Sequence, residues 1–249
     1  MDIKFFLNSV LFYISVPKCV VCNERLDLYD RGLCQSCKSI YEMHKTRNCS
    51  RCAKELNRCS CSNEYLKSHS VKKHFKLFRY LHTDQAIPGN KLIYSLKQDN
   101  REDVIDFLAE ELVECVKNNI EVIDNEKWLI TNVPRRKGAI IKFGYDHTEA
   151  LAKKIAAKLH IKYLKLLKSK SKKAQKEVRG LDRLLNANFD YLFKRDINLK
   201  GKTVLIIDDI ITTGASMGSC ALLIRGLGAR ECIALTVASA YNDEYVKRE

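Results

Sequence analysis

The sequence predicts an α/β domain with a mostly parallel sheet, preceded by a small module that folds around metal ions. From about residue 70 onward, short apolar runs typical of buried strands alternate with segments of helical periodicity. Ahead of them, eight of the eleven cysteines lie between residues 19 and 61. We therefore expect two parts, the metal-binding module with an N-terminal helix at 1–68 and the α/β domain at 69–249.

The cysteines of the module come in four close pairs, three of them C-x2-C and the last C-x-C. Two thiolates at this spacing wrap one edge of a tetrahedral ion, and eight thiolates fill two sites with no position left for water. The pattern therefore indicates two structural zinc ions rather than disulfides. The simplest arrangement is sequential, with the first four cysteines at one ion and the last four at the other, and an interleaved arrangement stays open. A histidine, His44, His69 or His74, can replace one cysteine, although we expect these histidines at the surface. The expected ligands are Cys19, Cys22, Cys34, Cys37, Cys49, Cys52, Cys59 and Cys61.

The composition points to polyanionic partners. Among 249 residues, 44 are Lys or Arg and 30 are Asp or Glu, which gives a formal charge of +14. Nucleic acid, phosphorylated metabolites or a membrane surface fit this charge, and so does a merely lysine-rich, solvated surface. The apolar segment 1–16 has no small-residue cleavage site and is too short to span a membrane. We therefore expect an N-terminal helix packed on the protein, no membrane span, and a location in the cytoplasm.

The chemistry is concentrated in the stretch 202–216, KTVLIIDDIITTGAS. Residues 204–207 have the composition of a buried strand, and two acids follow at its end. A turn of small and hydroxyl-bearing residues then leads into a helix with an apolar stripe. This arrangement aims backbone N–H groups and a helix N-terminus at an anion. Gly214 is expected to let the backbone approach the ligand closely. Acids beside an anion site suit the ring hydroxyls of a sugar phosphate.

The remaining elements follow from apolar periodicity and from breakers. A basic sequence, PRRKG at 134–138, follows one strand at the edge where ligands bind in open α/β sheets. The expected elements are a strand at 75–81, a turn at Pro88 and Gly89, a short helix at 91–97, a helix at 101–118, strands at 128–133 and 161–167, a helix over 150–159 and a last strand at 232–238.

A lysine-rich connection spans 168–193, and seven lysines lie between residues 162 and 176. Long connections inside α/β domains are often functional lids. This one can fold over a pyrophosphate or bind single-stranded nucleic acid by charge, or it can be a solvated loop.

The stretch 202–216 closely resembles the phosphoribosyl pyrophosphate (PRPP) motif of type I phosphoribosyltransferases. The whole chain resembles the ComF (ComF/GntX) family, which joins a zinc ribbon to such a domain. Besides the cysteine pairs, the shared features are Lys97 in IYSLK, Val133-Pro134 with its basic residues, and the spaced Gln175, Arg183, Asn186 and Phe189. The chain departs from the family at Phe143, where arginine is usual, and at Asp146 and His147, where Asn and Gln are common. These departures weaken the case for tight pyrophosphate binding, and Lys137 and Lys142 are the candidates to compensate.

The resemblance implies a type I phosphoribosyltransferase-like fold and a protein that handles single-stranded DNA in competence, with a retained PRPP site. The alternatives are a Mg-PRPP-dependent phosphoribosyltransferase with an unidentified acceptor, and a PRPP-sensing adaptor. Implied partners are PRPP or a related ribose phosphate, single-stranded DNA and a protein of the competence machinery, and implied ions are two structural zinc ions and Mg²⁺ with PRPP. The implied ribose-phosphate site comprises Asp208, Asp209, Thr212, Thr213, Gly214, Ala215 and Ser216, the pyrophosphate loop Arg135, Arg136 and Lys137, and the basic lid Lys168, Lys170, Lys172, Lys173, Gln175, Arg183 and Asn186.

Overall fold

The structure is a computed structural model that describes residues 17–82, 86–120, 124–170, 188–193 and 197–240. The predicted N-terminal helix lies outside these residues, as does most of the lysine-rich connection. Five predicted lid residues fall in the same excluded part, namely Lys172, Lys173, Gln175, Arg183 and Asn186. No helix in the described part of the chain is long and apolar enough to cross a membrane.

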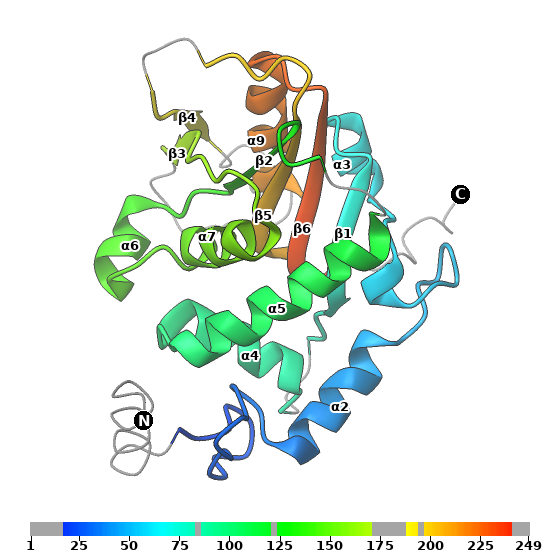
Figure 1. Ribbon diagram of the computed structural model, residues 1–249, viewed down its shortest axis with the longest axis vertical. Helices are drawn as coiled ribbons and strands as arrows, with labels where there is room; N and C mark the ends of the chain where they lie inside the picture. Colours follow the sequence, from blue (N-terminus) through cyan, green and yellow to red (C-terminus); the bar gives the residue numbers. More distant parts are fainter. Residues whose placement is uncertain (1–16, 83–85, 121–123, 171–187, 194–196, 241–249) are drawn as a thin grey trace.

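A four-stranded parallel sheet forms the centre of the molecule, in the order β1-β6-β5-β2 (Figure 1). Its strands are β1 (Lys73–Arg79), β2 (Trp128–Asn132), β5 (Thr203–Ile211) and β6 (Glu231–Ser239). Because the strands run in the same direction, their carboxyl ends meet at one edge, where ligands of such sheets bind. The predicted parallel α/β sheet is confirmed.

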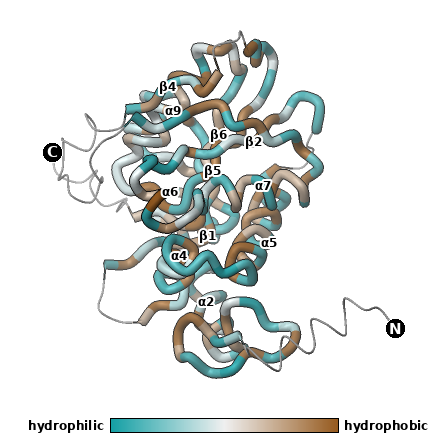
Figure 2. The backbone as a smooth tube through the Cα atoms, turned by 90° about the vertical axis from the view of Figure 1, so that its left-hand side faces the viewer, coloured by the Kyte–Doolittle hydropathy of each residue, from teal (hydrophilic) through white to brown (hydrophobic). Residues whose placement is uncertain are grey.

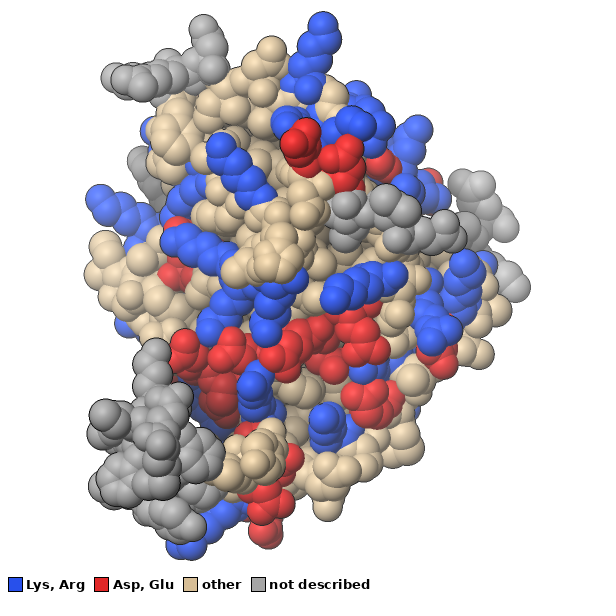
Figure 3. Space-filling view, in the orientation of Figure 1, with Lys and Arg blue, Asp and Glu red and all other residues tan. Residues whose placement is uncertain are grey.

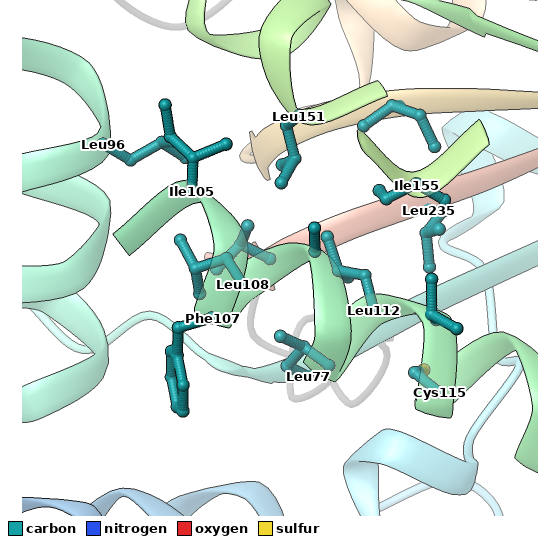
Figure 4. Close-up of a cluster of buried hydrophobic side chains, with 14 of the residues drawn as sticks. Leu77, Leu96, Ile105, Phe107, Leu108, Leu112, Cys115, Leu151, Ile155 and Leu235 are labelled. Atoms are coloured by element: carbon teal, nitrogen blue, oxygen red, sulfur yellow. The ribbon is translucent and has the colours of Figure 1, made fainter. Parts of the chain in front are cut away.

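Helices cover both faces of the sheet. On one face lie α4 (Pro88–Gln98), α5 (Glu102–Asn119) and α7 (His147–Leu159), whose apolar side chains join a buried cluster that Figure 4 shows around Leu108, Leu112 and Leu151. On the other face lies α9 (Ala215–Gly226), together with the short α3 (Glu64–Ser68). Each face of the sheet has its own buried apolar cluster. Alternate residues of β5 belong to the two clusters, because successive side chains of a strand point to opposite faces.

The N-terminal part of the described chain shares the main core. It comprises α2 (Gln35–Lys45), the 3-10 turn η1 (Leu56–Arg58) and the segments that carry the cysteines, and α2 lies toward the bottom of the view in Figure 2. Tyr41 of α2 is fully buried, with its ring centroid 5.7 Å from that of Phe78 and 5.4 Å from that of Phe107. The predicted boundary near residue 68 therefore crosses a continuous apolar cluster.

Three sequence predictions are wrong in detail. Pro88 and Gly89 begin α4 instead of forming a turn, because proline at the first helical position gives up no hydrogen bond. The segment 161–167 is not a strand: only Tyr163 bridges to β2, and the short β3 (Leu167–Ser169) pairs antiparallel with β4 (Phe189–Tyr191). β5 continues past the two acids to Ile211, because its pairing with β6 continues.

The prediction of surface histidines fails at His74. Its side chain is fully buried in β1, and its Nε2 lies 2.7 Å from the hydroxyl oxygen of Thr236. Burial lowers the pKa of His74 well below its usual range, so the ring is neutral in the core.

Candidate functional site

A cavity of about 390 Å³ opens at the carboxyl edge of the sheet. It is lined by the end of β5 and the turn after it, by the loop between β2 and α6 (Lys137–Phe143), by the starts of α7 and α9, by the end of α4, and by the β3–β4 hairpin. All seven residues predicted to bind the ribose phosphate line this cavity, namely Asp208, Asp209, Thr212, Thr213, Gly214, Ala215 and Ser216.

The hydroxyl-rich turn, residues 212–216, connects β5 to α9. Gly214 has φ +94°, a left-handed conformation that favours glycine, and it caps the N-terminus of α9. Thr213 Oγ1 accepts a hydrogen bond from the Ala215 N–H at 3.3 Å, and the Gly218 N–H donates to the Gly214 carbonyl at 2.7 Å. The first N–H groups of a helix have no partner within the helix, so the start of α9 offers this cavity a set of anion-binding donors.

The two adjacent acids occupy different environments. Asp209 is buried, and its carboxylate forms an ion pair with Lys97 Nζ at 3.2 Å and a hydrogen bond with His147 Nε2. Burial alone would raise the pKa of Asp209, but the charges of Lys97 and His147 lower it well below its usual range. For Asp208, burial and the charge of Asp209 raise the pKa well above its usual range. Asp209 is therefore the more acidic of the two carboxyl groups, whereas its environment favours the protonated form of Asp208.

Arg135 is held in place by its neighbours. Its guanidinium donates hydrogen bonds to the backbone carbonyls of Tyr145 at 3.2 Å and Lys97 at 3.1 Å, and it lies over the Phe143 ring, 4.6 Å from the centroid. The Phe143 ring thus makes a cation–π contact with Arg135. Arg135 and Arg136 line the cavity; Lys137, the third predicted residue, begins α6 as an exposed side chain.

Asp146 and His147 have structural partners that the sequence did not reveal. Asp146 caps α7: its Oδ1 accepts from the N–H groups of Thr148 and Glu149, each at 3.2 Å, and its Oδ2 accepts from the Arg135 N–H at 3.2 Å. His147 reaches Asp209 from the first turn of the same helix. The acid at 146 therefore orders the basic loop in addition to adding negative charge near it.

The described part of the basic connection forms the β3–β4 hairpin. Ser169 and Phe189 of this hairpin line the cavity. Lys168 and Lys170 do not line it, and both lie near the carboxylate of Asp190, with Nζ to oxygen distances of 3.8 Å and 3.1 Å. One acid thus offsets part of the positive charge that the sequence assigned to this segment.

The cysteines form two groups of four whose sulfur atoms all lie within 4.8 Å of one another. The pairing is sequential: Cys19, Cys22, Cys34 and Cys37 form the first group, and Cys49, Cys52, Cys59 and Cys61 the second. Sulfur ligands in sets of four fit zinc, and they leave no histidine in either set. The interleaved pairing and the replacement of a cysteine by histidine are therefore wrong for this structure.

In each group, backbone N–H groups favour the thiolate of one cysteine, Cys19 in the first group and Cys49 in the second. Burial raises the pKa of Cys19, but the N–H groups of Cys22, Cys34 and Val21 lower it to about 7. At the second group, the ammonium of Lys76 in β1 lies 3.4 Å from Cys59 Sγ and donates to the Cys61 carbonyl at 3.0 Å. Lys76 is itself buried, so a lysine inside the protein faces a set of four thiols. Its charge can offset the negative charge of a zinc–thiolate centre.

Comparisons with known proteins agree with this architecture. Residues 148–249 match the phosphoribosyl transferase domain family. The chain is 25% identical over 230 residues to the competence protein ComFC of Streptococcus pneumoniae, a match that covers 86% of this chain and 96% of that protein. It is also 38% identical over 53 residues to the ribose-phosphate pyrophosphokinase of Pyrococcus abyssi, which covers 21% of this chain and 19% of that protein.

Solved structures give weaker likenesses. A hypoxanthine phosphoribosyltransferase from Staphylococcus aureus aligns with 58% of this chain and 68% of its own, at 14% identity and a TM-score of 0.36. A purine phosphoribosyltransferase from Pyrococcus horikoshii aligns with 55% and 82%, at 18% identity and a TM-score of 0.33. The fold assignment rests on the domain match and the parallel sheet: this is a chain with a type I phosphoribosyltransferase fold. The near full-length similarity to ComFC confirms the resemblance to the ComF family.

Proposed function

We propose that the cavity at the carboxyl edge of the sheet binds PRPP or a related ribose 5-phosphate, in a Mg²⁺-dependent way. One observation carries the proposal: the hydroxyl-rich turn, the acids of β5 and the basic loop after β2 all line the same cavity. A phosphate needs the N–H donors of the turn, ribose hydroxyls need carboxylate acceptors, and a pyrophosphate needs cationic groups. The site offers all three within the reach of one small molecule.

The roles follow from the contacts of each side chain. The turn at 212–216 would take the 5-phosphate, and Asp208 and Asp209 would accept hydrogen bonds from the ribose hydroxyls. Arg136 and the Lys97 ammonium also line the cavity and would meet the remaining phosphates, because the Arg135 guanidinium is largely engaged with backbone carbonyls. The carboxylate of Asp208 suits Mg²⁺, whose preferred ligands are oxygen atoms, and the ion would neutralise charge on the pyrophosphate.

We further propose that the protein handles single-stranded DNA in competence. The near full-length similarity to a protein named as a competence protein supports this role, as does the excess of 14 positive charges. The charge is not spread evenly: acidic side chains gather in a band across the face in Figure 3, with lysines and arginines above it. On this side, acids of α5 are paired with Lys154, Lys158 and Arg31, so a strand of DNA is expected elsewhere.

The alternative is a phosphoribosyltransferase, and the apolar part of the cavity lining favours this activity. Beside the acids, the apolar side chains of Phe143, Phe189 and Met217 line the cavity. Apolar and aromatic surface next to a ribose-binding carboxylate can hold a flat acceptor such as a base. A transferase would release pyrophosphate when an acceptor is added, whereas a PRPP-sensing adaptor would bind PRPP and release none.

Calorimetry with Mg-PRPP tests the ribose-phosphate site. The double variant Asp208→Asn, Asp209→Asn removes the charged acceptors, and charge-assisted hydrogen bonds contribute about 1.5–3 kcal/mol each. We expect at least a tenfold loss of affinity. The double variant Asp27→Asn, Asp30→Asn, which changes the same number of acids in the N-terminal part, serves as the control. Equal affinities for all three proteins would refute the assignment.

Fluorescence anisotropy with labelled single-stranded DNA tests the second role. The slope of log K against log salt should be about −0.7 per phosphate neutralised. Replacing Lys168 and Lys170 with glutamine should weaken binding and flatten this slope, and Asp190→Asn, which removes their shared counter-charge, should strengthen binding. Salt-independent binding by the intact protein would remove the DNA proposal and leave the ribose-phosphate site in place.

A further inference from the structure

One asparagine joins the second cysteine group to the hydroxyl-rich turn. Asn63 follows the last cysteine of that group, Cys61, by two residues and caps α3, where its Oδ1 accepts a hydrogen bond from the Leu66 N–H at 2.8 Å. The Nδ2 of the same side chain donates to the Thr213 carbonyl at 3.3 Å. The cap of a helix in the N-terminal part is thus also a contact to the turn, across 150 residues of sequence.

The peptide bond explains what this contact does. The carbonyl of Thr213 and the N–H of Gly214 belong to one planar trans peptide and point in opposite directions. When Asn63 holds the carbonyl toward α3, the Gly214 N–H is directed to the other side of the turn. Residues 212–216 line the cavity, so this is the side on which an anion would be bound.

Helix α3 also packs against the backbone of the turn and of α9. A Cβ added at Gly214 would lie 2.9 Å from Leu66 Cγ, and one added at Gly218 would lie 3.1 Å from atoms of His69 and Tyr65. Gly214 therefore allows a close approach to α3. This corrects the expectation that its missing side chain makes room for the ligand. The turn lies between the cavity and α3, and α3 limits its movement away from the cavity.

The position of α3 depends in turn on the second cysteine group. A helix of five residues is too short to be stable by itself. At its N-terminal side, Arg51, which lies between Cys49 and Cys52, donates to the Ser62 carbonyl at 2.8 Å. The Ser62 hydroxyl donates to the Val71 carbonyl at 2.8 Å and so links the residues before α3 to those after it. The residues that lead into Asn63 are therefore fixed by the loop that supplies two of the four thiols.

We propose that Asn63 is a positioning residue for the phosphate-binding turn and that the second cysteine group, when metal is bound, sets its place. Metal loading at that group and affinity for the 5-phosphate are then coupled, although the cavity and the thiols do not touch. The identity of the ligand rests on the proposed function, whereas the coupling itself is a property of the chain without ligand.

Two variants separate the functions of the side chain. Asn63→Asp keeps the oxygen that caps α3 but replaces the donor to Thr213 with an oxygen that repels the carbonyl. Asn63→Ala removes both contacts. Asn90→Asp is the matched control, because Asn90 Nδ2 makes the same kind of bond, to the Leu81 carbonyl at 2.6 Å, and does not line the cavity.

The binding experiment uses the zinc-loaded full chain, Mg²⁺, and two probes, ribose 5-phosphate and pyrophosphate, by calorimetry. Asn63→Asp should weaken ribose 5-phosphate binding about tenfold, because a donor has been replaced by a second acceptor. Pyrophosphate, which would meet the basic loop, should bind unchanged. Equal weakening of both probes would mean that Asn63 has only a structural role, and unchanged binding of both would remove the proposal. If the wild-type chain binds neither probe, the proposed function fails.

Hydrogen exchange on the ligand-free protein decides the coupling without any ligand. Asn63→Asp should speed exchange at the amides of residues 213–216, and Asn90→Asp should not. Cys52→Ser, in the second cysteine group, should have the effect of Asn63→Asp, whereas Cys22→Ser, the change of an exposed cysteine of the first group, should not. Exchange in the turn that is the same in all four variants and the wild type would overturn the coupling.

Discussion

Replacing Gly214 with alanine tests how closely α3 packs against the turn. The substitution has two separate costs. The residue has φ +94°, a conformation that side chains other than glycine rarely adopt, and the new Cβ would lie 2.9 Å from Leu66 Cγ and 3.0 Å from Leu66 Cδ2. Leu66 is fully buried in the cluster under α9, so it cannot move aside without disturbing other core residues.

Both costs can be given a magnitude. A left-handed conformation costs an alanine about 1–2 kcal/mol, and crowding in a well-packed core costs about 1–3 kcal/mol. Alanine also lowers the conformational entropy of the unfolded chain, which stabilises the folded state by about 0.4–1 kcal/mol. The free energy of unfolding should therefore fall by about 3 kcal/mol, taking the middle of each range.

Gly144→Ala isolates the backbone cost. Gly144 has φ +78° at the end of α6, but a Cβ there would meet no atom within 4 Å. Its loss of stability in urea unfolding of the zinc-loaded chain should be about 1 kcal/mol. The difference between the two variants measures the contact with α3. Equal losses for Gly214→Ala and Gly144→Ala would show that α3 does not restrict the turn.

A double-mutant cycle gives a second measure of the same contact. Leu66→Ala removes the two atoms that approach a Cβ at position 214, at its own cost of about 2–5 kcal/mol. In the Leu66→Ala background, Gly214→Ala should cost mainly the backbone strain, because only Tyr65 Cδ1, at 3.3 Å, still lies close to the new Cβ. The cycle should therefore show a coupling of about 1–3 kcal/mol. Additive losses, within about 0.5 kcal/mol, would refute the reasoning.

Three further predictions concern the metal sites and the acids. Metal analysis of the reduced protein should find two zinc ions per chain, and one ion or none would contradict the assignment of two sites. Lys76→Met should speed the loss of one of these ions to a chelator, because the cation beside Cys59 is gone, while the other ion is lost at the wild-type rate; equal rates for both would exclude this role. Because burial and the charge of Asp209 raise the pKa of Asp208, its protonated form favours the fold, and stability from this group falls as pH rises through that pKa. At a pH at which Asp208 is protonated, Mg-PRPP should displace the proton, so calorimetry in buffers of different ionisation enthalpy should detect proton release that Asp208→Asn abolishes.

The parts of the site that the sequence predicted are those that local sequence determines. The run from Val204 to Ser216 contains a strand with two acids, a turn and a helix start in succession, and the structure differs from the prediction only in that the strand continues past the acids to Ile211. The cysteine pairs are equally local, because a knuckle needs only three or four residues. The sequential pairing was predicted as the simplest and is the one observed.

The contacts that the sequence did not predict join distant segments. Nothing near His147 indicates that its ring meets Asp209, 62 residues later, because that depends on how α7 crosses the carboxyl end of β5. The same holds for Asn63, which has an ordinary N-cap sequence and whose second contact is visible only in the folded chain. The strand expected at 161–167 failed for a related reason: its apolar residues face the cores, but only one of them pairs with β2.

The charge of the whole chain does not describe the charge of its cavity. Among the described residues, three cationic side chains line the cavity, Lys97, Arg135 and Arg136, against the two acids of β5. Lys97 is paired with Asp209, and the donors of Arg135 are directed to backbone carbonyls. Within the described part of the chain, these pairings leave little uncompensated positive charge for an anion with several phosphate charges. We therefore expect binding to depend on the backbone N–H groups of the turn and on a cation that accompanies the ligand. On this reasoning, the orientation of the peptide between Thr213 and Gly214 should influence affinity more than the overall excess of lysines does.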